Sequence, residues 1–178
     1  MMVGRLQRRL LIIPILTALI VSAAAKGHAE TLSDLTFLIG EWSGAGGGDP
    51  GQGLGSFSFA SDLQGRVLVR RAHTEYPASA SAPAFAHDDL LIVYANLRKA
   101  VYFDNEGHVI HYDITTDGNA KTVTFLSVDA PPSPLFRLTY NQTGPDTLRI
   151  TFELAPTGKR EDLRPYVAGE VTRKKNSG

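Results

Sequence analysis

The sequence of 178 residues contains no cysteine. A thiol nucleophile, a zinc–thiolate site and an iron–sulfur cluster are therefore excluded, because all three require cysteine sulfur. Without disulfides, the hydrophobic core alone must hold the fold together, even in an oxidising compartment. An excess of positive charge is also missing, since 18 basic residues balance 18 acidic ones. Nucleic-acid binding, which needs a basic face, is not favoured.

The N-terminal segment has the pattern of an export signal. Three arginines precede an uncharged apolar run over 10–21, and small residues follow it before Glu30. This run is short for spanning a bilayer, so we predict a cleaved signal peptide over 1–29 and not a retained anchor. The mature chain would be one domain over 30–178 without a transmembrane segment, exported to a bacterial periplasm or secreted. Its net charge would be 14 − 18 = −4, because the signal carries four basic residues and no acidic one.

Short strands dominate the expected mature chain, and helical turns are expected only at 32–39 and 159–164. The segment 147–154 strictly alternates apolar and polar residues, which is typical of a half-buried antiparallel strand. Turn residues separate ten such segments, which indicates an all-β antiparallel barrel or sandwich. The strands are expected at roughly 40–46, 54–62, 66–76, 85–95, 99–105, 108–116, 120–127, 135–142, 146–155 and 166–174.

The densest glycine cluster, over 44–53, follows the only tryptophan, Trp42. A phosphate-binding loop needs its glycines between a strand and a helix, so that the helix N-terminus meets the anion. Here both neighbouring segments have strand patterns, and no Gly-Lys-Ser/Thr follows. We therefore interpret the cluster as a hairpin connection.

The triplet Gly40-Glu41-Trp42, after a short helical turn and at the start of the first strand, resembles the signature of the calycin barrels. These are the lipocalins, the fatty-acid-binding proteins and the nitrobindin-like proteins. The resemblance implies a single up-and-down barrel whose floor is closed by the tryptophan. It also implies a basic residue on the last strand that stacks over the indole, and Arg173 stands there. Gly40, Trp42 and Arg173 are thus expected to be structural.

The alternation of glycine around Trp42 is most similar to the nitrobindin-like group. His87-Asp88-Asp89 resembles the His-x-Glu element of that group, with aspartate in place of glutamate. Nitrobindin-like proteins that hold haem take their iron ligand from a histidine late in the chain, whereas no histidine follows His111 here. We predict no cofactor, and haem stays an alternative that would need a different histidine.

Polar side chains recur at alternate positions in the first half of the expected barrel. They are Arg71, His73 and Glu75 on 66–76, His87 and Asp89 on 85–95, and Tyr102 and Asp104 on 99–105. Residues two apart point to the same side of a barrel wall. If these faces point inward, they oppose an apolar wall formed by Phe136, Leu138, Ile150 and Phe152. We expect such a lumen to bind a small apolar or amphipathic ligand, with an arginine pairing a carboxylate head group.

Three other interpretations stay open. The polar wall could serve an isomerase or hydrolase of a lipophilic substrate, with acid–base chemistry at His73/Glu75 or His87/Asp89. The same four side chains could surround a divalent metal, but histidines hydrogen bonded to neighbouring carboxylates are favoured, so no metal is predicted. A barrel with a filled lumen would be an interaction module of the cell envelope. The sequence does not indicate an oligomeric state.

Overall fold

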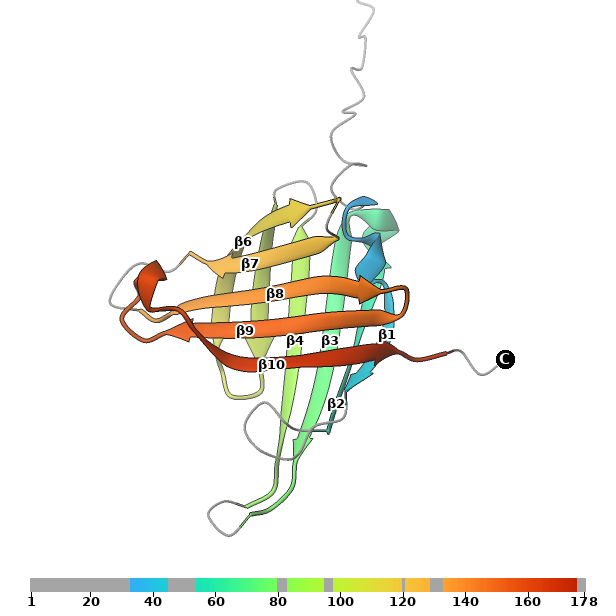
Figure 1. Ribbon diagram of the computed structural model, residues 1–178. Helices are drawn as coiled ribbons and strands as arrows, with labels where there is room; N and C mark the ends of the chain where they lie inside the picture. The colour runs from blue at the N-terminus through green and yellow to red at the C-terminus, as the bar shows by residue number, and fades with distance from the viewer. Residues whose placement is uncertain are drawn as a thin grey trace, which may run out of the picture.

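A computed structural model describes the chain over 33–44, 54–79, 83–94, 98–119, 121–128 and 133–175. Within these residues, ten antiparallel strands form a closed barrel (Figure 1). Each strand pairs with its neighbours in sequence, and β1 closes the barrel by pairing with β10. The prediction of an up-and-down barrel is confirmed. The predicted export signal over 1–29 and the glycine cluster beyond Gly44 lie outside the described residues.

Most expected strands and both expected helical turns agree with the observed elements to within a few residues. The strands are β1 (Gly40–Gly44), β2 (Leu54–Asp62), β3 (Val67–Tyr76), β4 (Phe85–Tyr94), β5 (Lys99–Asp104), β6 (Val109–Asp117), β7 (Thr122–Ser127), β8 (Leu135–Gly144), β9 (Thr147–Ala155) and β10 (Arg164–Arg173). Short 3-10 turns are η1 (Thr36–Leu38), η2 (Leu63–Gly65) and η4 (Arg160–Asp162).

Trp42 closes one end of the barrel together with η1. Its side chain is fully buried, and its Nε1 donates a hydrogen bond to the backbone oxygen of Leu38 at 2.8 Å. The guanidinium carbon of Arg173 lies 4.1 Å from the indole centroid, which is a cation–π contact. Arg173 also donates to the backbone oxygens of Phe37, at 3.1 Å, and of Ile39. These contacts join η1 to the seam between β1 and β10.

Gly40 has a backbone φ of +132°, which side-chain-bearing residues rarely adopt. A Cβ atom at this position would collide with the guanidinium of Arg173. The glycine therefore leaves space for the arginine that covers Trp42. This packing gives a physical reason for a glycine two residues before the tryptophan.

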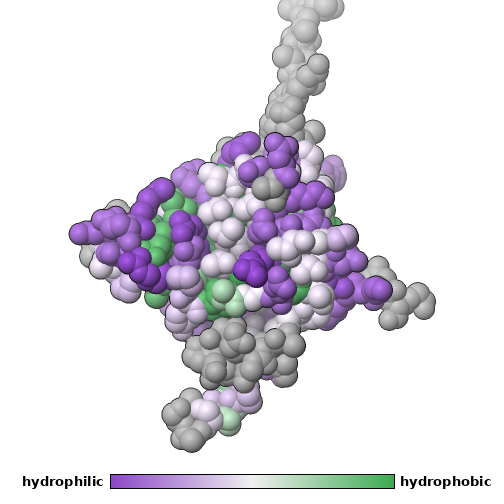
Figure 2. All heavy atoms as spheres, in the orientation of Figure 1, coloured by the Kyte–Doolittle hydropathy of each residue, from purple (hydrophilic) through white to green (hydrophobic). Residues whose placement is uncertain are grey.

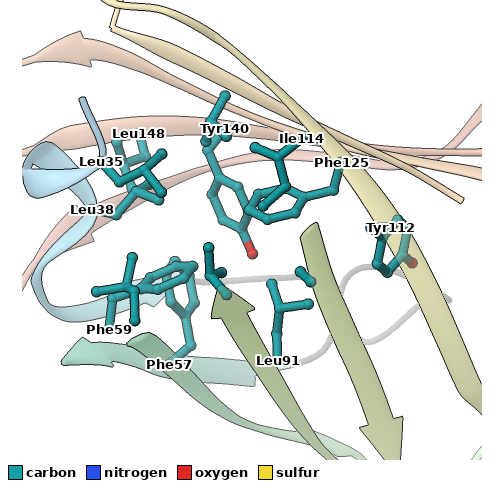
Figure 3. Close-up of a cluster of buried hydrophobic side chains, with 14 of the residues drawn as sticks. Leu35, Leu38, Phe57, Phe59, Leu91, Tyr112, Ile114, Phe125, Tyr140 and Leu148 are labelled. Carbon is teal, nitrogen blue, oxygen red and sulfur yellow. The ribbon is translucent and has the colours of Figure 1, made fainter. Parts of the chain in front are cut away.

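Aromatic side chains fill the half of the barrel next to η1. Tyr140 reaches from β8 across the lumen and meets Phe57 and Phe59 of β2, with ring centroids 6.0 and 5.5 Å apart (Figure 3). Phe125 packs against the same tyrosine at 6.1 Å. Since β2 and β8 belong to opposite walls, these contacts close the interior of this half with side chains.

The other end of the barrel, opposite η1, differs because several inner side chains there are only partly buried. We call this end the mouth. β9 ends and β10 begins there, with η4 between them. Figure 2 shows hydrophobic side chains at the surface beside η4 and again near the lower centre of the view, among hydrophilic and near-neutral ones.

Candidate functional site

Arg70 is a charged side chain of β3 that enters the lumen. In the strand register it lies opposite Phe59 of β2 and Leu91 of β4, which are both buried. Its side chain is 13% exposed, and its guanidinium carbon lies 5.1 Å from the ring centroid of Phe57. Its Nη1 donates to Oδ1 of Asp89, whose side chain is 7% exposed. Because the pair is largely desolvated, losing one partner would leave an uncompensated charge.

Arg71, His73 and Glu75 lie on the outer surface, so the condition that this face of β3 points inward is not met. A period of two fits either face of a strand, and the inner face of β3 itself carries an arginine, so hydropathy did not distinguish the faces. His73 Nδ1 lies 2.7 Å from Asp88 Oδ1, and its Nε2 lies 3.4 Å from Glu75 Oε1. These two hydrogen bonds raise the pKa of His73. Ligand binding by the three residues stays a prediction.

Three buried side-chain atoms have no hydrogen-bond partner within the described part of the chain: Nε of Arg70, the hydroxyl of Tyr140 and Oε1 of Gln142. The first two are donors and belong to the lumen. Tyr140 is fully buried, and Figure 3 shows its hydroxyl directed toward the wall that carries Phe57 and Leu91. Burial raises the pKa of Tyr140 to about 12, so the phenol keeps its proton at neutral pH. Both atoms can therefore donate a hydrogen bond.

His87 links the inner wall to the connection between β5 and β6. Its Nδ1 lies 2.8 Å from Glu106 Oε1, and its Nε2 lies 3.0 Å from the hydroxyl of Tyr102. The same Nε2 is 3.9 Å from Asp89 Oδ2. Burial raises the pKa of Tyr102, so this hydroxyl also stays protonated. A carboxylate, an imidazole and a phenol thus form one hydrogen-bonded chain, which can orient a polar group or transfer a proton.

Asp104 lies directly opposite Asp89 in the register of β4 and β5. Like charges in this position repel, and each carboxylate has a partner of its own. Asp104 accepts from the backbone N–H of His108 at 2.9 Å, and its other oxygen lies 2.8 Å from Nδ1 of the same histidine. Burial by itself raises the pKa of Asp104, but the hydrogen bonds from His108 and Tyr102 outweigh it and hold the pKa below its ordinary value.

The apolar wall of the lumen lies opposite these polar groups, because β8 and β9 face β3 and β4 across the barrel. Phe136 and Phe152 stack with ring centroids 5.9 Å apart and planes inclined by 10°. Leu138 lies opposite Phe152 in the register, and Ile150 lies opposite Tyr140. These apolar side chains of the wall are only partly buried, so apolar area remains accessible near the mouth.

The structure brings together four of the seven residues expected to bind a ligand. They are His87, Asp89, Tyr102 and Asp104. Sequence reasoning missed Arg70 and Tyr140. The sequence does indicate an inward position for Arg70, because Leu68 and Ala72, two residues before and after it, are apolar. Val67 and Val69 give a similar indication for the opposite face of the strand, so the pattern does not choose between the faces.

A metal site made from His73, Glu75, His87 and Asp89 is contradicted by the strand orientation. His73 points outward and His87 points inward, so the two imidazoles lie on opposite sides of the wall. Within the described ranges, no three side chains of His, Cys, Asp and Glu are grouped so that they could hold a metal ion.

The fold and site define a closed ten-stranded antiparallel barrel, compatible with a calycin-like fold, with a polar inner wall opposite an apolar one. No protein-family model matches the chain, and no curated protein sequence matches it either. In the part of the chain that the structure describes, no helix has the length and apolar character needed to cross a membrane.

Proposed function

We propose that the protein binds a small apolar or amphipathic molecule in the lumen, between the mouth and the aromatic cluster. The observation that carries this proposal is the pair of unpartnered buried donors, Arg70 Nε and Tyr140 Oη. A buried polar group without a partner costs about 1–3 kcal/mol, so a ligand that supplies an acceptor oxygen would recover this free energy. The apolar wall at Phe136 and Phe152 would cover the body of such a ligand.

The charges of the inner wall favour an uncharged head group. Arg70 is already paired with Asp89, and Asp104 lies next to that pair. A carboxylate placed at Tyr140 would approach Asp89, whose charge already acts on the phenol, and this repulsion opposes its binding. A hydroxyl or carbonyl oxygen accepts from Tyr140 without this repulsion. The carboxylate head group expected from the sequence is therefore replaced by a neutral one in this proposal.

The test compares ligands that differ only in the head group. N-phenyl-1-naphthylamine, an uncharged fluorescent probe, is bound to the purified protein and displaced by decanol, 2-decanone, decanoate or decylamine at pH 7. We expect the alcohol and the ketone to displace the probe at concentrations at least tenfold lower than decanoate. Equal displacement by all four compounds would contradict a defined polar end of the site.

A matched pair of variants locates the binding. Phe152→Ser places a hydroxyl in the apolar wall, whereas Phe103→Ser makes the same change at a side chain that is 38% exposed and lies outside the core clusters. We expect Phe152→Ser to weaken probe binding at least tenfold and Phe103→Ser to leave it unchanged. If both variants bind like the wild type, the lumen is not the site.

Acid–base catalysis is a second candidate, favoured by the chain from Glu106 through His87 to Tyr102. A bound substrate near the mouth would meet a protonated phenol backed by an imidazole and a carboxylate, which suits proton transfer in an isomerase or hydrolase. His87→Gln separates the two functions. It should abolish turnover of a substrate and change the affinity for decanol by less than threefold if the chain is catalytic.

The described histidines do not fit an axial ligand for haem. His87 points into the lumen, but both of its ring nitrogens are already within hydrogen-bond distance of Glu106 and Tyr102. His73 and His111 are exposed on outer faces, and His108 bonds to Asp104 at the mouth. We therefore propose a ligand that needs no iron-coordinating histidine.

Export to a bacterial periplasm or the medium is part of the proposal. It rests on the basic, apolar and small-residue pattern over 1–29. Mass spectrometry of the protein recovered from its host should find a mature N-terminus near Glu30. A retained N-terminal segment would contradict cleavage.

A further inference from the structure

A cavity lies on the outer wall of the barrel, where β2 carries short side chains. Ser56 and Ser58 form its floor, and neighbouring strands supply longer side chains on both sides. Along one cross-strand row, Ser58 lies between Glu41 of β1 and Arg71 of β3. Together with His73 and Lys174, these residues line a cavity of about 420 Å³. We call it the serine trough.

The serine trough contains two cations without an ion-pair partner in the described residues, the guanidinium of Arg71 and the ammonium of Lys174. The hydroxyls of Ser56 and Ser58 have no described partner either. Arg71 therefore differs from Arg70, Arg137 and Arg173, whose guanidinium groups pair with carboxylates. Free guanidinium and hydroxyl donors over one floor are the groups that bind an oxoanion through charge-assisted hydrogen bonds.

Glu41 limits the choice of ligand. Its carboxylate lines the same cavity and lies on the other side of Ser58 from Arg71. A bare anion would be attracted by Arg71 and repelled by Glu41. Asp88, beside His73, adds a second carboxylate to the lining. A molecule that also carries hydroxyl groups could donate to Glu41 while its oxoanion meets Arg71. His73 lies in the next row, opposite Ser56, and is paired with Asp88.

We propose that the serine trough binds a small hydroxylated oxoanion, such as a sugar phosphate or a sugar acid. Arg71 and the two serine hydroxyls hold the oxoanion, and Glu41 accepts hydrogen bonds from the hydroxyl groups. This site is separate from the lumen, because Arg71 and Glu41 are on the outer face while Arg70 and Trp42 are on the inner face. Its occupation requires no opening of the barrel.

The first experiment is a calorimetric titration of the purified protein with glucose 6-phosphate, gluconate, glucose and inorganic phosphate at pH 7 and low salt. We expect glucose 6-phosphate or gluconate to bind at least tenfold more tightly than glucose and than inorganic phosphate. The stronger of the two identifies the oxoanion as phosphate or carboxylate. No binding of either, or binding no tighter than that of glucose, overturns the proposal.

Arg71→Gln and Arg149→Gln form a matched pair, since both remove one positive charge from an exposed arginine on the outer wall. Arg71→Gln should weaken binding of the tighter ligand at least tenfold, and Arg149→Gln less than twofold. An equal loss in both variants would show attraction by overall charge only and would overturn the site.

Glu41→Gln tests the hydroxyl contacts with a second readout. It should weaken binding of the sugar ligand several-fold and leave inorganic phosphate binding unchanged or tighter, because the repulsion of the bare anion is removed. If the variant binds both the sugar ligand and inorganic phosphate more tightly by the same factor, Glu41 does not accept hydrogen bonds from the sugar hydroxyls. The assignment of the ligand class is then overturned.

Discussion

Arg70 and Asp89 form an ion pair on the inner side of the barrel wall, while their sequence neighbours Arg71 and Asp88 lie on the outer side. Each doublet of like charges is thus divided by the wall, because successive side chains of a strand point to opposite faces. Asp88 pairs outside with His73. The same two residue types therefore serve as a desolvated pair inside and as solvated groups outside.

Because Asp88 and Asp89 lie on opposite sides of the wall, we expect the same substitution at the two positions to change stability by very different amounts. Asp89→Ala leaves the charge of Arg70 buried without a partner and should lower the free energy of unfolding by about 3–5 kcal/mol. Asp88→Ala removes a side chain that is 59% exposed and should cost less than about 1 kcal/mol. Urea unfolding followed by tryptophan fluorescence measures both. Equal effects would contradict the orientation of β4.

The closed end of the barrel should be sensitive to two substitutions that act on one contact. Arg173→Met removes the cation–π contact with Trp42 and the hydrogen bonds to the backbone of η1. We expect a loss of about 1–3 kcal/mol in the free energy of unfolding. Gly40→Ala should cost a similar amount, because it combines a strained φ with a collision at Arg173.

A double variant checks that both substitutions act through this packing. Gly40→Ala and Arg173→Met together should cost clearly less than the sum of the two single effects, since the methionine no longer occupies the space that the added Cβ needs. Thermal unfolding monitored by near-UV circular dichroism reports the tryptophan environment in all three proteins. Strict additivity would show that Gly40 and Arg173 are independent.

The fold could be predicted because strand alternation and turn residues are local properties. Leu148, Ile150 and Phe152 alternate with polar residues, and their strand was placed correctly as β9. The site was predicted only in part, because local patterns do not state which face of a polar strand is inside. β3 has valines on one face and Leu68 and Ala72 on the other, so the choice between Arg70 and Arg71 depended on register with Phe59 and Leu91.

The local sequence pattern also does not predict which residues of distant strands come together, because this depends on closure of the barrel. Tyr140 and Arg70 face the same interior only after the barrel has closed, since the two belong to opposite walls. Glu106 lies in the turn between β5 and β6, and this turn brings its carboxylate to His87 of β4. The turn pattern alone does not indicate this contact, because it depends on how the turn lies against β4.

Asp104 predicts a specific contribution to acid unfolding. Its pKa is lower in the folded protein than the ordinary value of 3.8, so the folded state favours the ionised form. The stability from this group is therefore present above about pH 4 and is lost as the pH falls through the folded-state pKa. Asp104→Asn should remove this part of the pH dependence. Urea midpoints measured from pH 2 to 6 should show a flatter acid limb than in the wild type, and an unchanged limb would contradict it.

His73 predicts the opposite sign. Hydrogen bonds to Asp88 and Glu75 raise its pKa above 6.5 in the folded protein. Its stabilising effect is present below pH 6.5 and is lost as the pH rises through the folded-state pKa. A histidine ring titration by NMR should give a pKa above 6.5, and Asp88→Asn should shift it downward. An identical titration in the variant would show that the Asp88 contact does not persist in solution.

Tyr140→Phe should have opposite effects on stability and on ligand binding. The hydroxyl of Tyr140 is buried without a described partner, so its removal relieves a desolvation cost and should raise the free energy of unfolding by about 1 kcal/mol. The ring remains, and its contacts with Phe57, Phe59 and Phe125 are kept. The variant should nevertheless bind decanol at least fivefold more weakly, because the donor to the head group is lost.

Tyr112→Phe is the matched control for this prediction. Tyr112 is 2% exposed and packs on Phe125 at 6.2 Å, as Tyr140 does at 6.1 Å, but its hydroxyl is not among the unpartnered buried atoms. Its removal should lower stability or leave it unchanged, with decanol affinity intact. A Tyr140→Phe protein that is less stable than the wild type would show that the hydroxyl is satisfied inside the folded barrel. The lumen would then lack the donor on which binding of a neutral head group depends.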